Sequence, residues 1–189
     1  MNDEPAVLTE RARRVMVVTI NRPDQRNAVN AAVAEGIAAA MDELDGDDGL
    51  SLGVLTGAGK GFCAGMDLKA FVAGESPYFG DRGFAGITQR ASAKPLIAAV
   101  EGFAVAGGLE VALSCDLIVA ARGARLGIPE VKRSLVAGTA RCTSVRARPA
   151  RASRRTRSLP RERPRSSSPA RRSHPGGRRT RCRANRPTR

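Results

Sequence analysis

The sequence predicts an α/β domain with a parallel sheet over residues 1–139, followed by a disordered tail over residues 140–189. One observation behind this is the repeated order strand, loop, helix, strand, which favours parallel strands joined by right-handed crossovers. The other is an abrupt change of composition after Thr139. Together they predict one folded unit whose ligand-binding loops lie at the carboxyl ends of its strands.

The first strand and helix of this repeat are expected on either side of a turn. Residues 15–20 form an apolar, β-branched run that stops at Asn21-Arg22-Pro23, so they predict a buried strand. A helix is expected over residues 31–44, capped by Asn30. Its apolar side chains fall on one face at helical spacing, namely Val33, Ile37, Ala40, Met41 and Leu44.

Three further strands are expected over residues 50–56, 95–100 and 115–120. Between the strands expected over residues 50–56 and 95–100, residues 74–92 are rich in Gly, Ser and aromatic residues. They predict a mobile loop with a helix near residues 87–93. The last two strands are separated by a loop and a short helix, which is expected over residues 108–114.

Residues 140–189 have the composition of a disordered segment. They contain 18 Arg, no Lys, six Pro and seven Ser, and their only large aliphatic residues are Val145 and Leu159. Such a segment cannot bury enough apolar area to offset the cost of ordering its backbone, about 1–2 kcal/mol per residue. The same composition arises when a GC-rich gene is read out of frame. The sequence therefore leaves open a genuine basic tail or a frameshift near Gly138.

Charge and cysteine content exclude several classes of function for the folded part. The chain has a net charge of +14, but residues 1–139 carry −3 and residues 140–189 carry +17, so the basic character belongs to the tail. The four cysteines form no C-x-x-C pair and His174 is the only histidine, which argues against a Cys/His zinc site. No secretory signal and no membrane-spanning stretch is recognisable, so a cytoplasmic protein without a membrane anchor is expected.

Two glycine-containing segments could hold a carbonyl group. Residues 61–68 follow a predicted strand, and small residues there would expose backbone N–H groups to a ligand. Gly107 and Gly108 open a predicted helix, whose free N–H groups and positive dipole end suit a developing oxyanion. Taken alone, each segment also fits an ordinary turn.

Two glutamates are candidates for proton transfer. Glu110 lies in the first turn of the helix that begins at Gly107 or Gly108, and Glu130 follows 20 positions later after one more strand. In a layout of alternating strands and helices, both could reach the same end of the sheet. Two carboxylates facing one pocket can differ in pKa, which provides one acid and one base. Taken alone, each also fits a helix-start acid that only stabilises its helix.

As a set, these motifs resemble the enoyl-CoA hydratase/isomerase (crotonase) superfamily in order and spacing over about residues 6–138. The matching segments are Asn21-Arg22-Pro23, Asn27-Ala28-Val29, Phe62 to Leu68, Gly102 to Glu110, Cys115-Asp116-Leu117 and Gly127-Ile128-Pro129-Glu130. The resemblance implies a crotonase-like ββα spiral with a parallel sheet.

The resemblance also implies where an acyl-CoA substrate lies. The backbone N–H groups of Ala64 and Gly107 would form the oxyanion hole. The coenzyme A groove would be lined by Arg26, Asn27, Ala28, Ala64, Gly65, Met66, Asp67 and Leu68, with Asp67 ordering its loop rather than reacting. No cofactor is expected, because coenzyme A is part of the substrate.

The two glutamates occupy the positions of both acids in hydratases of this superfamily. Their presence favours hydration of a trans-2-enoyl-CoA to a 3-hydroxyacyl-CoA, a lyase reaction of fatty acid metabolism. Glu110 is interpreted as the base and Glu130 as the acid. The alternatives are other acyl-CoA chemistry such as isomerisation, or an inactive fragment.

The segment after residue 138 departs from the superfamily and bears on partners. Relatives of this type form homotrimers or hexamers through C-terminal helices, which an Arg/Pro/Ser-rich segment replaces here. A different class of function, an Arg-rich nucleic-acid-binding protein, therefore has to be weighed. Its charge predicts non-specific nucleic-acid binding by counterion release, but the tail has no aromatic residue for base stacking.

Overall fold

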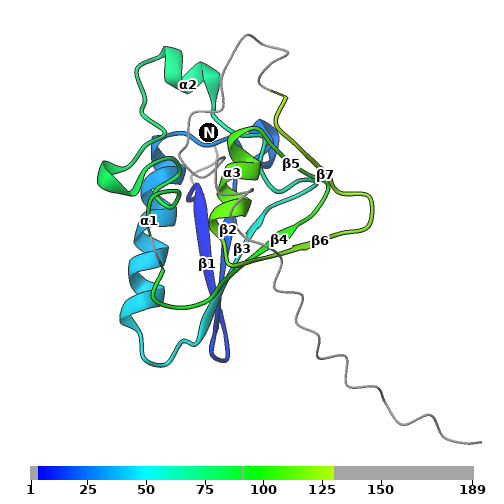
Figure 1. Cartoon of the computed structure of the whole chain (residues 1–189). Helices are drawn as coiled ribbons and strands as arrows, with labels where there is room; N and C mark the ends of the chain where they lie inside the picture. The colour runs from blue at the N-terminus through cyan, green and yellow to red at the C-terminus, as the bar shows by residue number, and fades with distance from the viewer. Residues whose placement is uncertain (1–3, 91, 130–189) are drawn as a thin grey trace, which may run out of the picture. The chain divides into compact units, whose positions relative to one another are not determined.

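The computed structural model describes residues 4–90 and 92–129 (Figure 1). Glu130 and the predicted tail over residues 140–189 lie outside the described residues. Within the described part, no helix is long and apolar enough to cross a membrane.

A five-stranded sheet forms the centre of the described chain. Its order is β1 (Val7–Ala12), β2 (Val15–Ile20), β3 (Leu52–Gly57), β4 (Leu96–Val100) and β6 (Leu117–Ala120). The strands from β2 to β6 run parallel, and only β1 is antiparallel to its neighbour. The predicted α/β class with a parallel sheet is therefore confirmed. The sequence analysis missed β1, because this edge strand is largely exposed and lacks a buried apolar pattern.

A second, two-stranded parallel sheet pairs β5 (Phe103–Val105) with β7 (Arg125–Gly127). Residues 102–108 were expected to form only a loop. Strands of three residues carry too little periodicity to be recognised in a sequence. This small sheet brings the residues before α3 (Gly107–Ser114) next to the residues that follow β6.

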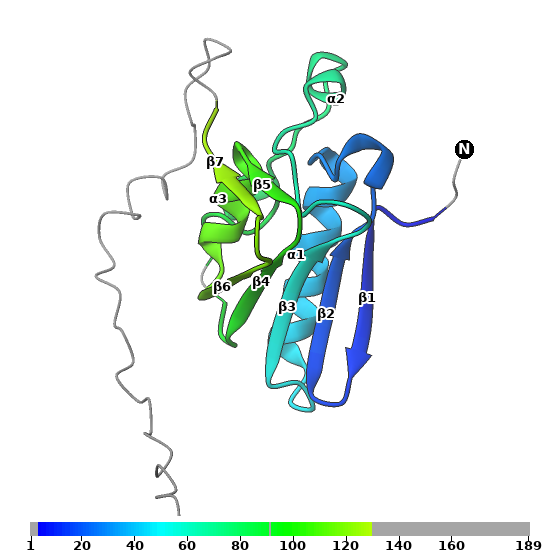
Figure 2. The same ribbon diagram turned by 90° about the vertical axis from the view of Figure 1, so that its right-hand side faces the viewer.

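Helix α1 (Ala31–Gly46) packs along one face of the large sheet (Figure 2). Asn30 caps it as predicted, since the side-chain oxygen accepts a hydrogen bond of 3.2 Å from the Val33 N–H. The helix buries one apolar face, made of Val33, Ala34, Ile37, Ala38, Ala40, Met41 and Leu44. Close contact with β1 requires a glycine at position 36, where a Cβ would lie 2.8 Å from the Val7 side chain.

The helix expected near residues 87–93 is not formed, and that prediction was wrong. Residues 85–89 make turns, preceded by a short 3-10 helix, Gly80–Arg82. Gly83, Ala85 and Gly86 all have positive φ, which a right-handed helix does not allow. Ion pairs tie the segment to α1 instead, from Arg82 to Asp42 and from Arg90 to Asp42 and Asp45.

The parallel strands β2, β3, β4 and β6 all end at the same edge of the sheet. The loops that follow the first three of them are residues 21–30, 58–67 and 101–102. A short helix that the sequence analysis did not predict, α2 (Leu68–Val72), stands at this same end in both ribbon views (Figures 1 and 2). This edge is where parallel sheets hold their ligands.

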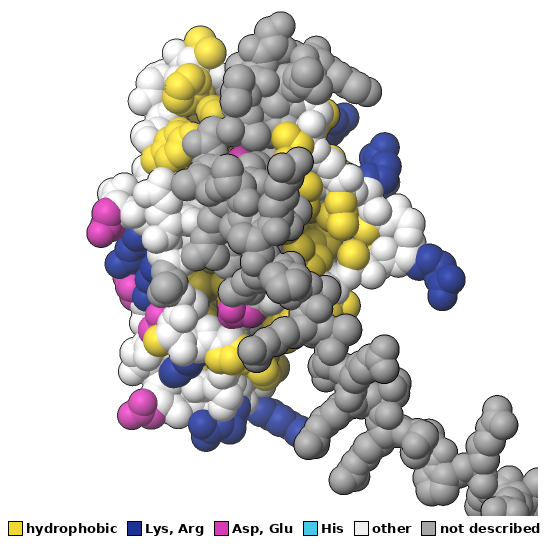
Figure 3. Space-filling view, in the orientation of Figure 1, with side chains coloured by type: hydrophobic (Ala, Val, Ile, Leu, Met, Phe, Trp, Pro, Cys, Tyr) yellow, Lys and Arg dark blue, Asp and Glu magenta, His cyan; other side chains and the backbone are white. Residues whose placement is uncertain are grey.

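Apart from Leu8 on β1, the exposed large apolar side chains of the described residues lie in two regions (Figure 3). One region covers α2 and the loop after it, with Leu68, Phe71, Val72, Tyr78 and Phe79. The other covers β6 and the end of β7, with Leu117, Val119, Leu126 and Ile128. Grouped apolar surface of this kind is more typical of contact surfaces than of solvated ones.

Candidate active site

Residues 62–67 form a segment that bends at Phe62 and Gly65 and lies between two other parts of the chain. On one side the segment lies alongside β5, where Phe62 N–H donates to Phe103 O at 2.9 Å and Val105 N–H donates to Cys63 O at 3.1 Å. On the other side it pairs with the loop after β2. The segment therefore joins the loop predicted to bind coenzyme A to the strand that leads into α3.

The pairing with the loop after β2 uses backbone groups only. Ala64 N–H donates to Arg26 O at 3.1 Å, Val29 N–H donates to Gly65 O at 2.8 Å, and Asp67 N–H donates to Val29 O at 2.9 Å. The Gly65 C=O and the Met66 N–H belong to one trans peptide group and so point in opposite directions, and this C=O points to Val29. The N–H group of Met66 therefore faces away from this loop, toward the side occupied by β5 and the start of α3.

The oxyanion hole predicted from the resemblance needs one correction in this geometry. The Ala64 N–H is already donated to Arg26 O, so it does not face a thioester held beside α3. The Met66 N–H, by contrast, has no acceptor among the described residues. The sequence analysis missed this amide because the sequence does not show to which side each N–H of the segment turns.

The second predicted donor lies at the beginning of α3. Neither the Gly107 nor the Gly108 N–H donates to an acceptor within the described residues, as expected for the first turn of a helix. A Cβ on Gly65 would lie only 2.9 Å from Gly107 N, so the Gly65-Met66 backbone and the helix start are in close contact. The Met66 and Gly107 amides therefore lie close together.

The approach of α3 depends on backbone features that only small residues permit. A Cβ on Gly108 would lie 2.2 Å from the carbonyl oxygen of Cys63, so any side chain there would push the helix away. Ala106, directly before the helix, has φ 54° and ψ −134°, a conformation that non-glycine residues rarely adopt. Backbone strain of this kind is concentrated at functional sites.

Glu110 lies one turn further along α3 than Gly107, on the same face of the helix. Glu110 is only 4% exposed, and its backbone N–H donates to Ala106 O at 3.3 Å. Glu110 is therefore largely removed from solvent, and it lies one helical turn after the Gly107 amide. Glu130, the second acid predicted from the sequence, lies outside the described residues, so the pairing of the two acids stays a prediction.

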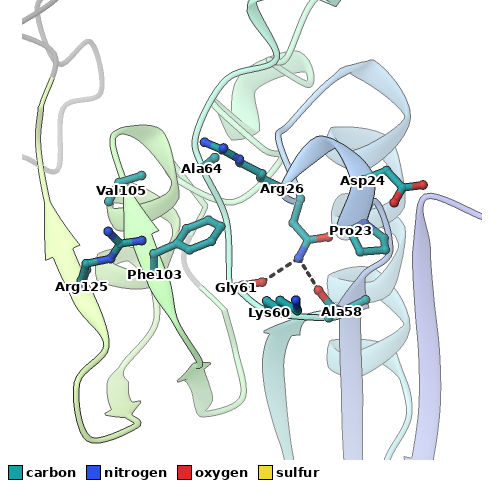
Figure 4. A pocket seen from close by; sticks show the side chains of 12 residues that line it. Pro23, Asp24, Arg26, Ala58, Lys60, Gly61, Ala64, Phe103, Val105 and Arg125 are labelled. Carbon is teal, nitrogen blue, oxygen red and sulfur yellow. Dashed lines mark hydrogen bonds between the residues drawn. The ribbon is translucent and has the colours of Figure 1, made fainter.

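Two pockets flank the paired loops. One has a volume of about 930 Å³ and includes five predicted groove residues, Arg26, Ala28, Met66, Asp67 and Leu68. The other has a volume of about 830 Å³ and includes Arg26, Asn27 and Ala64 (Figure 4). Gly65, the remaining predicted groove residue, lines neither pocket and packs against α3 instead.

The second pocket has a cationic wall that the sequence analysis did not identify. Among the described residues that line it are three cations, Arg26, Lys60 and Arg125, and one acid, Asp24, and Phe103 adds an aromatic ring (Figure 4). These residues come from three separate segments, which the sequence alone does not bring together. The charge balance suits an anionic ligand group such as a phosphate.

Asn27 was predicted to line the groove, but its side chain also has a structural role. The residue is 1% exposed, and its Nδ2 donates to Ala58 O at 2.8 Å and to Gly61 O at 2.7 Å, as the dashed lines in Figure 4 show. Its Oδ1 accepts from the Arg22 N–H at 3.0 Å. The amide thus ties the loop after β2 to the loop after β3.

Asp67 orders its loop in the way the sequence analysis expected. Its Oδ1 accepts hydrogen bonds from the Lys69 and Ala70 N–H groups and so caps α2. Its Oδ2 lies 2.9 Å from the Arg22 guanidinium. Burial disfavours the charge, but the hydrogen bonds from Ala70, Arg22 and Lys69 outweigh it and hold the pKa of Asp67 below its usual value.

The Cys63 thiol, in the segment of residues 62–67, is fully buried, and burial raises its pKa to about 12. Because folding disfavours the Cys63 thiolate, its contribution to the free energy of unfolding is complete below about pH 8.5 and is lost as the pH rises toward 12.

We expect this thiol to resist iodoacetamide at pH 8 in the folded protein and to react once the protein is unfolded in guanidinium chloride. Mass spectrometry of the tryptic peptides measures the labelling of each cysteine, and rapid labelling of Cys63 under native conditions would contradict this expectation.

Metal binding can be assessed only for the described residues. Within residues 4–90 and 92–129, no three His, Cys, Asp or Glu side chains lie close enough together to hold a metal ion. The expectation that the reaction needs no separate cofactor stays a prediction.

Comparisons with known proteins show to which family the chain belongs. The profile of the enoyl-CoA hydratase/isomerase family matches residues 10–154. Mevalonyl-coenzyme A hydratase SIDH from Beauveria bassiana is 45% identical over 135 residues, which are 65% of this chain and 48% of that protein. Enoyl-CoA hydratase EchA19 from Mycobacterium tuberculosis is 44% identical over 138 residues, 69% of this chain and 52% of that protein.

A solved structure shares the fold of the described part. The crystal structure of enoyl-CoA hydratase EchA1 from Mycobacterium marinum superposes with a TM-score of 0.70 at 63% sequence identity, covering 71% of this chain and 53% of that one. The chain therefore spans about half the length of the curated relatives and solved structures that it matches.

Proposed function

Because the chain belongs to the enoyl-CoA hydratase/isomerase family, we propose that its site adds water to the double bond of a 2-enoyl-CoA thioester. The observation that carries this proposal is that the Met66 and Gly107 amides, neither of which has an acceptor among the described residues, lie close together, with the buried residue Glu110 one helical turn after Gly107. Hydratases among the relatives act on coenzyme A thioesters, which supports the same substrate class here.

In the proposed reaction, the two amides donate hydrogen bonds to the thioester carbonyl oxygen. They stabilise the negative charge that develops there as the oxygen of water forms a bond to Cβ. Each such donor contributes about 10²–10³-fold to the rate. Because Gly107 lies at the start of α3, the positive end of the helix dipole also acts on the same oxygen.

The protons are exchanged by carboxyl groups. Glu110 takes one proton from the attacking water, and a second acid delivers a proton to Cα, so that the product is a 3-hydroxyacyl-CoA. Glu130 is the candidate for this second role by its place in the sequence. The order of the two roles follows the interpretation made from the sequence.

The coenzyme A arm is proposed to lie in the two pockets beside Arg26. The cationic wall of Arg26, Lys60 and Arg125 would pair with its phosphates, because guanidinium and ammonium groups bind phosphate oxygens strongly. Assembly into trimers or hexamers, a cytoplasmic location and a role in fatty acid metabolism stay predictions. The exposed apolar side chains on α2 and on β6 and β7 are the surfaces that such an assembly would cover.

Hydration can be tested directly with crotonyl-CoA as the substrate. Addition of water removes the conjugated double bond, so the absorbance of the enoyl thioester falls as the reaction proceeds. Calorimetry with butanoyl-CoA, which has no double bond to hydrate, measures binding separately from turnover. Folded protein that neither binds butanoyl-CoA nor hydrates crotonyl-CoA would contradict the proposal. Conversion of a 3-enoyl-CoA without hydration of crotonyl-CoA would favour isomerisation instead.

A further inference from the structure

An ion pair between Arg22 and Asp67 connects the two loops that build the candidate site. The guanidinium Nη1 lies 2.9 Å from Asp67 Oδ2, and the two side chains are only 18% and 13% exposed. The sequence analysis gave Arg22 no role, although it belongs to the Asn-Arg-Pro turn after β2. Both residues line the pocket of about 930 Å³.

Each partner of this pair is fixed to a different loop. Arg22 Nη1 also donates to Ala28 O at 2.7 Å, and the Arg22 backbone N–H donates to Asn27 Oδ1 at 3.0 Å. Asp67 donates its backbone N–H to Val29 O at 2.9 Å and caps α2 with its other carboxylate oxygen. The ion pair therefore holds residues 27–29 in contact with the beginning of α2.

Met66 lies directly before Asp67, so its backbone position depends on this ion pair. Asp67 and Gly65, the residues on either side of Met66, bond to Val29, which leaves the Met66 N–H directed to the side of α3. If Asp67 moved, the peptide plane that carries the Met66 N–H would be the next to rotate. A change of a few tenths of an ångström there weakens a hydrogen bond to a developing oxyanion, because such bonds depend steeply on geometry.

A second Arg–Asp pair in the same chain provides a comparison. Arg11 and Asp47 also form an ion pair at 2.6 Å, but their side chains are 54% and 32% exposed, and they lie on β1 and just after α1. Surface pairs of this kind contribute little to stability. The Arg22–Asp67 pair is partly buried, so its charges are more costly to desolvate, and fixing a single conformation is one reason why proteins keep such pairs.

We propose that Arg22 and Asp67 are positioning residues, which keep the Met66 amide aligned with the Gly107 amide while an acyl-CoA thioester occupies the groove. This inference rests on the proposed function, because it assigns the two amides to the thioester carbonyl. It predicts that breaking the pair lowers polarisation of the carbonyl more than it lowers binding of coenzyme A.

The test uses D67N and R22K, with D47N and R11K as matched controls in the surface pair. 4-Dimethylaminocinnamoyl-CoA is the probe, because its absorption moves to longer wavelength when hydrogen bonds polarise its carbonyl group. We expect the controls to retain the full red shift of the bound probe. We expect D67N and R22K to lose at least half of it, with less than about a threefold change in Kd.

With crotonyl-CoA, the same two variants should lower kcat by about 10–100-fold, part of the 10²–10³-fold that one oxyanion donor contributes, and leave KM nearly unchanged. R22K keeps the positive charge and so provides a second reading if D67N lowers the melting temperature. A full red shift in both folded variants would overturn the positioning role alone. Failure of the unmodified protein to bind the probe, or binding without any red shift, would overturn the proposed function and this inference with it.

Discussion

Replacing Glu110 by glutamine is expected to lower the rate of crotonyl-CoA hydration by about 10²–10⁴-fold, the usual contribution of a placed proton-transfer group. Glutamine has nearly the same shape, so α3 and the Met66 and Gly107 amides should be retained. It cannot take a proton from water, which removes the step assigned to Glu110. The measurement is kcat with crotonyl-CoA, together with the circular dichroism spectrum and melting temperature.

Glu35→Gln is the matched control for this substitution. Glu35 is an exposed residue on α1, 75 positions before Glu110, and its replacement by glutamine makes the same change of charge and shape. Its kcat should equal that of the unmodified protein. An E110Q variant that binds butanoyl-CoA and keeps full turnover would remove Glu110 from the mechanism.

The largest expected effect on stability comes from replacing Asn27 by aspartate. The Asn27 amide nitrogen donates to the carbonyl oxygens of Ala58 and Gly61 at 2.8 and 2.7 Å in a site that is 1% exposed. A carboxylate oxygen in its place would face two carbonyl oxygens without a proton to share. We expect N27D to lower the free energy of unfolding by about 3–5 kcal/mol, as when a buried charge is left without a partner.

Urea denaturation followed by circular dichroism measures this difference at pH 7. Asn30→Asp is the control, because Asn30 accepts the Val33 N–H as the cap of α1 and aspartate caps helices equally well. N30D should therefore change the free energy of unfolding by only a few tenths of a kcal/mol. Equal effects of the two substitutions would mean that the Asn27 hydrogen bonds do not hold the loops together.

Local signals in the sequence predicted the elements that a single segment determines. The apolar, β-branched run of residues 15–20 and the cap at Asn30 predict β2 and α1, and both are confirmed. The glycines at positions 107 and 108 predict the start of α3, which places Glu110 in its first turn. These features depend on neighbours within a few positions, so the order of residues is sufficient to find them.

The sequence also determined the family, through six short motifs in a fixed order, but it did not determine which N–H group of residues 62–67 is turned toward α3. Ala64 and Met66 are two positions apart in one segment, and both have N–H groups of the same chemistry. Only the partners on each side distinguish them, because Arg26 takes the first N–H and Val29 bonds to the residues around the second. Three other features also depend on partners from distant segments. They are the burial of the Asn27 side chain, the ion pair of Arg22 with Asp67, and the cationic pocket. They join segments that lie 30 to 100 positions apart, and such contacts are decided by the tertiary structure alone.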